Sequence, residues 1–189
     1  MSQFFQAGYE CDTIKIVEMI NDDQNTDAVR DIIKGIISSD KGHTTQADTL
    51  KFLNQQLNGR LSNYFNEKGQ SPLFFDAILK GQEALIVSLL QYKINLNQTD
   101  PFMGNTALLL AVMNHIDLPT IKLLTTKENI SLRNNERLSP LDAAKMREDT
   151  ETVAFLESRS MSKHRFIGET QKNKPSGPEV VSDLKNTFK

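Results

Sequence analysis

Residues 69–73 read Gly-Gln-Ser-Pro-Leu, and related openings follow at 104–108 (Gly-Asn-Thr-Ala-Leu) and 138–141 (Leu-Ser-Pro-Leu). The Ser or Thr of each opening recurs at intervals of 35 and then 33 residues, and an apolar pair follows each opening. A fixed period of this length is typical of stacked repeats. Each unit reads as a turn, a short apolar helix and a longer amphipathic helix. Such a unit cannot bury its apolar face alone, so we expect its neighbours to cover it.

The three openings resemble the ankyrin repeat, a unit of 33 residues that begins Gly-x-Thr-Pro-Leu-His. Residues 95–97 (Asn-Leu-Asn) stand where that family has Asp-Val-Asn before the next hairpin. The resemblance implies that Ser or Thr caps each first helix and that Gly allows a tight turn before it. The chain departs from the family at the His position, which holds Phe74, Leu109 and Asp142. We therefore expect divergent repeats that lack the family's usual polar network.

The pattern extends towards the N-terminus. Residues 4–7 (Phe-Phe-Gln-Ala) align with residues 74–77 (Phe-Phe-Asp-Ala) at an offset of 70, which is two units of 35. Apolar spacing predicts helices over 27–39 and 46–57 between them. A helical cap that is not a repeat is the alternative for this region.

The predicted fold class is all-α: an ankyrin-type helix-turn-helix solenoid of about four to five repeats, with a flexible C-terminal tail. The expected units lie near 1–25, 26–66, 67–101, 102–134 and 135–158, and the first two are divergent. The apolar pairs predict four core leucines at the buried ends of second helices, Leu89, Leu90, Leu123 and Leu124.

Residues 159–189 form a basic segment with seven Lys or Arg and three Asp or Glu, which we expect to be largely disordered. Within it, residues 176–179 (Ser-Gly-Pro-Glu) have the form of a capping box. Val180, Val181, Leu184 and Phe188 follow at the spacing of one helical face. About a dozen residues are too few for a stable isolated helix, so this segment is predicted to form a helix only on docking. A solvated tail is the alternative.

Composition limits the function classes. The net charge of −2 over 189 residues favours neither nucleic acid nor a membrane surface. No signal peptide or apolar run long enough to span a bilayer is evident. A single cysteine, Cys11, fits a reducing compartment. These features predict a cytoplasmic protein that is monomeric alone.

The sequence offers little catalytic chemistry. His43, His115 and His164 are far apart, and no pair of residues has the short spacing of zinc ligands. Cys11 aligns with Gly81 in a turn between helices, and nothing nominates a base to activate it. We expect no cofactor, no metal and no enzymatic activity.

Binding is better supported. Hairpin tips normally carry polar residues, yet the tips at 64–68 and 100–104 hold aromatic residues and Met, which are enriched at protein interfaces. Outward positions of the first helices repeat Met at equivalent places, an adaptable apolar stripe. The predicted partner-binding residues are Tyr64, Phe65, Lys68, Lys80, Phe102, Met103, Met113, Asn114, Met146 and Arg147. The alternative is that Phe102 covers the core and the Met residues fill gaps between helices.

The sequence thus predicts a non-catalytic module that recognises another protein, of unknown identity, through its concave face. It would act as an adaptor or an inhibitor. Small divergent ankyrin proteins resemble, in style alone, effectors that intracellular bacteria deliver into host cells, which suggests the host cytoplasm as a second location. The alternatives are an enzyme with a site in residues 21–66 and a structural subunit of a larger assembly.

Overall fold

The computed structural model describes residues 1–22, 26–65 and 73–160. These residues form helices joined by turns, with an isolated β-bridge between Thr99 and Thr106. The all-α fold class is confirmed. The α-helices are α1 (Gln3–Tyr9), α2 (Thr13–Asp22), α3 (Thr26–Ser38), α4 (His43–Gln56), α5 (Leu61–Phe65), α6 (Leu73–Leu79), α7 (Glu83–Leu89), α8 (Ala107–Met113), α9 (Leu118–Leu124) and α10 (Pro140–Met146), followed by a last helix over 150–160. Short 3₁₀ helices are η1 (Leu90–Tyr92) and η2 (Asn129–Ser131).

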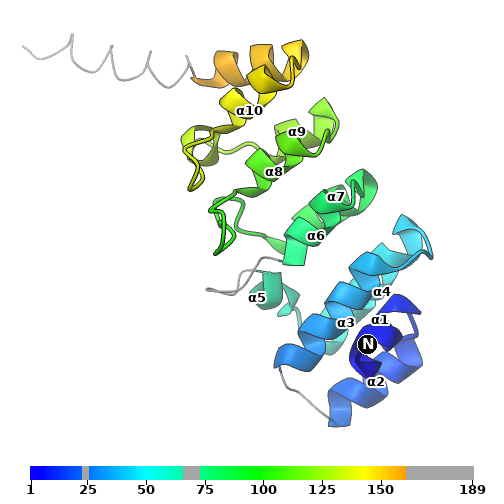
Figure 1. Cartoon of the computed structure of the whole chain (residues 1–189). Coiled ribbons are helices and arrows are strands. Elements are labelled where there is room, and N and C mark those ends of the chain that lie inside the picture. Colours follow the sequence, from blue (N-terminus) through cyan, green and yellow to red (C-terminus); the bar gives the residue numbers. More distant parts are fainter. Residues whose placement is uncertain (23–25, 66–72, 161–189) are drawn as a thin grey trace, which may run out of the picture.

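Most helices form antiparallel pairs that stack one upon another (Figure 1). The first helices, α1, α3, α6, α8 and α10, pack each against the next and form one layer. The second helices α2, α4, α7 and α9 pack in the same order and form the other layer. The long loops that precede α8 and α10 project from the same side of the stack (Figure 1). Each helix pair therefore covers the apolar face of the pair before it.

Two first helices begin at the hydroxyl caps that the sequence predicts. The Thr106 side chain accepts a hydrogen bond of 3.2 Å from the backbone N–H of Leu109. The Ser139 side chain accepts one of 3.2 Å from the N–H of Asp142, whose carboxylate accepts one of 3.1 Å from the N–H of Ser139. This reciprocal capping box satisfies two backbone donors at once. The third predicted cap, Ser71, lies outside the described residues.

The turns after α1, α6, α8 and α10 share one left-handed backbone position. Cys11, Gly81, His115 and Glu148 occupy equivalent positions and have φ values of 52°, 65°, 59° and 56°. Left-handed backbone suits Gly and is uncommon for other residues, so four coincident values mark one recurring turn. The alignment of Cys11 with Gly81 is confirmed, and His115 lies at the equivalent position of the turn after α8.

The N-terminal region contains the helices that its apolar spacing predicts. Helices α1 and α6 lie 70 residues apart, and α3 and α4 match the helices expected at 27–39 and 46–57. Helices α1 and α3 pack with their backbones in contact at Gly8 and Gly35, since a Cβ on either glycine would overlap a carbonyl oxygen of the other helix. This close packing explains why both positions hold glycine.

One core prediction is wrong. Leu89 and Leu124 are fully buried and Leu90 is half-buried against the core, but the side chain of Leu123 is 52% exposed. The pairs Leu89–Leu90 and Leu123–Leu124 therefore do not occupy the same helical positions.

An additional residue after α8 explains the difference. After α6, the N–H of Gln82 bonds to the carbonyl of Ala77 at 3.0 Å, and Gln82 itself is the N-cap of α7. After α8, the equivalent bond to the carbonyl of Ala111 comes from the buried Ile116, and Asp117 caps the next helix one residue later. The second helix thus starts one residue later relative to the first, and the second leucine of the pair becomes the buried one.

Candidate protein-binding surface

The hairpin loop before α8 is organised by one carboxylate. Oδ1 of Asp100 accepts hydrogen bonds from the backbone N–H groups of Phe102 (3.0 Å) and Met103 (2.6 Å). Oδ2 of Asp100 accepts a third, of 2.7 Å, from the N–H of Asn105. The backbone N–H of Asp100 also donates to the carbonyl of Asn105 at 3.0 Å, which closes the loop. Such turns, in which an Asp side chain binds the backbone that follows it, hold a loop in one conformation.

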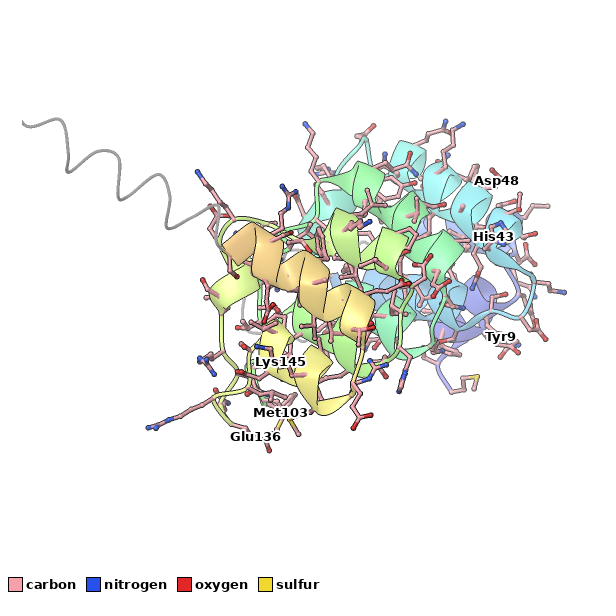
Figure 2. The ribbon with its side chains drawn as sticks, turned by 90° about the horizontal axis from the view of Figure 1, so that it is seen from above. Tyr9, His43, Asp48, Met103, Glu136 and Lys145 are labelled. Carbon is pink, nitrogen blue, oxygen red and sulfur yellow. The ribbon has the colours of Figure 1, made fainter. Side chains whose placement is uncertain are left out.

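The hairpin loop before α10 holds this tip in place through hydrogen bonds. Asn135 donates from its backbone N–H to the carbonyl of Met103 and from its side-chain amide to the carbonyl of Phe102, each at 2.8 Å. Gly104 has a φ of 71°, and a Cβ there would lie 2.8 Å from Oδ1 of Asn135. Glycine therefore permits both the turn and the close approach of the two loops. Met103 and Glu136 lie at the same edge of the molecule (Figure 2).

A buried amide pair supports the same junction. The side-chain amide of Asn134 donates to Oδ1 of Asn105 at 2.9 Å, and both residues are buried. The Oδ1 atom of Asn134 also accepts from the N–H groups of Glu136 and Leu138, at 3.0 and 2.9 Å. Asn134 thus organises its own loop much as Asp100 organises the preceding one.

The side chain of Phe102 is 79% exposed although its backbone is bound on both sides. Met103 beside it is also exposed. This placement contradicts the alternative in which Phe102 covers the core. The loop presents an aromatic side chain to solvent from a backbone that is already ordered.

A second group of exposed apolar side chains lies at the C-terminal ends of the first helices. Leu79, Met113 and Met146 end α6, α8 and α10, and all three are exposed, Met146 to 76%. The alternative in which Met113 and Met146 fill gaps between helices is therefore wrong. Phe102 and Met103 precede α8 whereas Met113 ends it, so the predicted residues form two groups at opposite ends of the first helices.

Polar residues follow the second group. Lys80 donates to Oγ of Ser38 at 2.7 Å, and the Asn114 amide donates to a backbone carbonyl of its own helix at 2.8 Å. The half-buried Arg147 contacts the ring nitrogen Nδ1 of His115 in the neighbouring turn. Lys80 and Arg147 therefore connect successive turns along the stack, whereas the Asn114 amide bonds within its own helix.

The predicted tip at 64–68 is not an exposed aromatic site. Phe65 is fully buried, because the short α5 turns inward and packs against α3 and α6. Its ring stacks on Tyr92 with 6.3 Å between centroids. Tyr64 is half-buried, and its carbonyl accepts a hydrogen bond of 3.2 Å from the buried Arg30. The prediction for Phe65 is wrong, and Lys68 lies outside the described residues.

Charges of both signs surround the loop that leads into α10. Arg133 pairs with the carboxylate of Asp142 at 2.6 Å. The Ser139 hydroxyl and backbone N–H, together with Arg133, hold the pKa of Asp142 below its usual range, although partial burial opposes them. An ionised Asp142 therefore stabilises the start of α10.

The residues that order the tips are not among the predicted binding residues: Asp100, Asn134 and Asn135. Asp and Asn are favoured at the start of turns because their side chains bind the following backbone N–H groups. Asp100 and Asn134 precede the Thr or Ser of an opening by six and five residues, and this recurrence was a signal for them. The contact between neighbouring loops at Asn135 has no local sequence signal.

A cavity of about 400 Å³ lies among α2, α3, α4 and α5, in the segment that the enzyme alternative concerns. Its lining combines apolar side chains with amides, one guanidinium and one phenol: Ile20, Thr26, Val29, Gln56, Leu57, Asn58, Arg60, Asn63 and Tyr64. Across residues 1–22, 26–65 and 73–160, no group of three or more His, Cys, Asp or Glu could hold a metal ion.

Comparison with known proteins adds no relative: no protein-family model matches the sequence, and no curated protein was found to be similar. None of the helices in the described part of the chain combines the length and apolar character needed to cross a membrane.

Proposed function

We propose that this chain is a divergent ankyrin-type repeat protein of four to five units that recognises another protein without catalysis. Three observations support the repeat assignment. The openings recur every 33–35 residues, two of them cap helices through Thr106 and Ser139, and the turns after α1, α6, α8 and α10 share one left-handed position. Stacks of this kind expose extended surfaces that suit macromolecular partners.

The observation that carries the binding proposal is the exposure of Phe102 on an ordered loop. Large aromatic side chains are the commonest anchors of protein interfaces. A side chain on a preorganised loop loses little conformational entropy when a partner binds, so more of the contact energy becomes affinity. Phe102 would enter an apolar pocket of the partner, and Met103 would pack at the rim of that pocket.

The exposed ends of the first helices would extend the contact. Leu79, Met113 and Met146 form a row along α6, α8 and α10, and methionine adapts to irregular partner surfaces. The protein would act as an adaptor, or as an inhibitor that covers the active surface of its partner. It would work in the cytoplasm, either of its own cell or of a host cell to which it is delivered.

The test is affinity capture with Phe102→Ala against a matched control, Ile14→Ala, which removes another exposed apolar side chain on α2. Capture is compared from a eukaryotic and a bacterial lysate, and the affinity for the captured protein is then measured. Truncating an anchor weakens binding by roughly 2 kcal/mol or more, which is about 30-fold. We expect this loss for Phe102→Ala alone, with thermal stability unchanged in both variants.

Equal affinity of the wild type and both variants would contradict the proposal for Phe102. So would a large fall in melting temperature for Phe102→Ala with unchanged affinity, because it would place the side chain in the core. A photoreactive phenylalanine at position 102, compared with one at position 14, offers an independent readout of direct contact.

A further inference from the structure

The C-terminal end of the stack has a groove that no further helix pair covers in the described part of the chain. It lies between α10 and the helix over 150–160, has a volume of about 320 Å³, and is lined by Lys145, Glu148, Thr150, Val153, Ala154 and Glu157. A salt bridge of 2.8 Å between Lys145 and Glu157 crosses from one helix to the other. The exposed surface within the groove is mostly apolar.

Comparison with the preceding helix pair shows what this end lacks. The caps Asp117 and Asp149 place Ile121 of α9 in the same position as Val153. Ile121 is fully buried within the stack, whereas Val153 is only half-buried. The next buried position is unaffected, since Leu124 and its equivalent Leu156 are both fully buried. The loss of cover is therefore confined to the outer face, where a following element would lie.

The chain itself supplies a segment with the right pattern. Residues 161–189 continue directly from the helix that forms one wall of the groove. Within them, Val180, Val181, Leu184 and Phe188 have the spacing of one helical face, after a capping box at 176–179. A helix of this length needs an apolar surface to be stable.

The length and the charge of the C-terminal segment favour docking in the chain's own groove. The fifteen residues 161–175 can span at most about 50 Å, while the helix over 150–160 is only about 16 Å long. Residues 159–189 carry a net charge of +4, from seven Lys or Arg and three Asp or Glu. Because the whole chain has a net charge of −2, residues 1–158 carry a net charge of −6. The groove itself presents the carboxylates of Glu148 and Glu157. Tethering also raises the effective concentration of the segment.

We propose that residues 176–188 bind as a helix in the groove between α10 and the helix over 150–160 and cap this end of the stack. The apolar face of the segment would cover Val153 and Ala154. The basic residues that precede the segment, within 163–174, would lie near Glu148 and Glu157. The proposal does not depend on the partner-binding function.

The test uses the full-length chain with Leu184→Asp and the matched control Asn186→Asp. Both variants add one negative charge, but residues 184 and 186 lie about 200° apart on a helix, so only the first disrupts the apolar face. NMR amide shifts and hydrogen exchange of residues 145–157 are compared with the wild type. We expect Leu184→Asp to shift the amides of Val153 and Ala154 and to speed their exchange about tenfold, as for the loss of one buried Leu. Asn186→Asp should leave both unchanged.

A substitution in the groove provides the reciprocal test. Ala154 is exposed, so Ala154→Arg should fold normally while it fills the groove. We expect residues 176–188 to lose helical chemical shifts in this variant and in Leu184→Asp. Identical groove shifts in the wild type, Leu184→Asp and Asn186→Asp would overturn the proposal, and so would changes located at Phe102 or Met113. Sedimentation at several concentrations would detect docking of residues 176–188 on a second copy of the chain. That result would also overturn the proposal.

Discussion

The side-chain amide of Asn135 donates a hydrogen bond of 2.8 Å to the carbonyl oxygen of Phe102, so one hairpin loop orders the exposed aromatic residue of the loop before it. The backbone N–H of Asn135 donates to the neighbouring carbonyl of Met103 at the same distance. The position of Phe102 thus depends on a residue 33 positions later in the chain.

Asn135→Ala should loosen the tip without unfolding the stack. Loss of one hydrogen bond of this kind lowers the free energy of unfolding by about 1 kcal/mol. We expect faster amide exchange over 100–105 and weaker binding of any partner that contacts Phe102. Glu136→Ala, in the same loop, is the control and should leave exchange in the preceding loop unchanged. Unaltered exchange over 100–105 in Asn135→Ala would show that the Asn135 side-chain amide is not needed to order the tip.

The two leucines at the end of α9 should respond very differently to truncation. Leu124 is fully buried and Leu123 is 52% exposed. Leu124→Ala should lower the free energy of unfolding by about 2–5 kcal/mol, as truncation of a buried Leu does. Leu123→Ala, an identical change at the neighbouring position, should lower it by about 0.5 kcal/mol or less. Urea unfolding of both variants gives the comparison, and equally large losses for both would support the sequence prediction that both leucines belong to the core.

The leucines illustrate which parts of the fold can be predicted from the sequence. The period of the openings, the hydroxyl caps and the apolar spacing depend on local chemistry, and they placed the helices correctly, including α3 and α4. Which face of a second helix points into the core depends on the number of residues in the connecting turn before it. Ile116 shows the limit, because the apolar pairs alone do not indicate where an additional residue lies in the turn or which leucine it buries.

The candidate site could be predicted only in part, for a related reason. Exposure of Phe102 followed from its place in a hairpin tip, where its backbone N–H bonds to the nearby Asp100. Phe65 lies in a similar sequence context but is buried, because α5 directs its ring onto Tyr92. Whether such an aromatic residue turns inward depends on the space between helices that are distant in the sequence. No local sequence pattern indicates that space.

The stability of the chain should depend on pH through Asp142. Its pKa in the folded protein lies below the ordinary value of 3.8, chiefly because the Ser139 hydroxyl donates to the carboxylate. A lowered folded pKa means that the ionised group stabilises the fold above the ordinary pKa, and that this contribution is lost as the pH falls through the lowered value.

Asp142→Asn should therefore reduce the free energy of unfolding most at neutral pH, and the difference from the wild type should shrink below about pH 4. Urea unfolding at a series of pH values measures this difference. Glu136→Gln removes a carboxylate from the preceding loop and is the control for net charge. A difference that stays constant from neutral pH into the acid range would exclude the carboxylate as the cause.

The last prediction concerns the contact between α1 and α3 at Gly35. A Cβ at this position would overlap the carbonyl oxygen of Phe5 and lie 2.7 Å from the backbone nitrogen of Tyr9. Within a helix, Gly→Ala alone would stabilise by about 1 kcal/mol, because alanine has the higher helix propensity. Gly35→Ala should nevertheless lower the free energy of unfolding by about 1–3 kcal/mol, since the two backbones must separate.

The sign of the change in the free energy of unfolding distinguishes the gain in helix propensity from the overlap of the two backbones. Urea unfolding gives the stability, and amide exchange over 3–22 should rise as α1 moves away from α3. Lys51→Ala, on the exposed side of α4, is the control for helix propensity and should leave exchange over 3–22 unchanged. A Gly35→Ala variant that is more stable than the wild type would mean that α1 does not pack on α3 with its backbone in contact, and that the N-terminal pair joins the stack in another way.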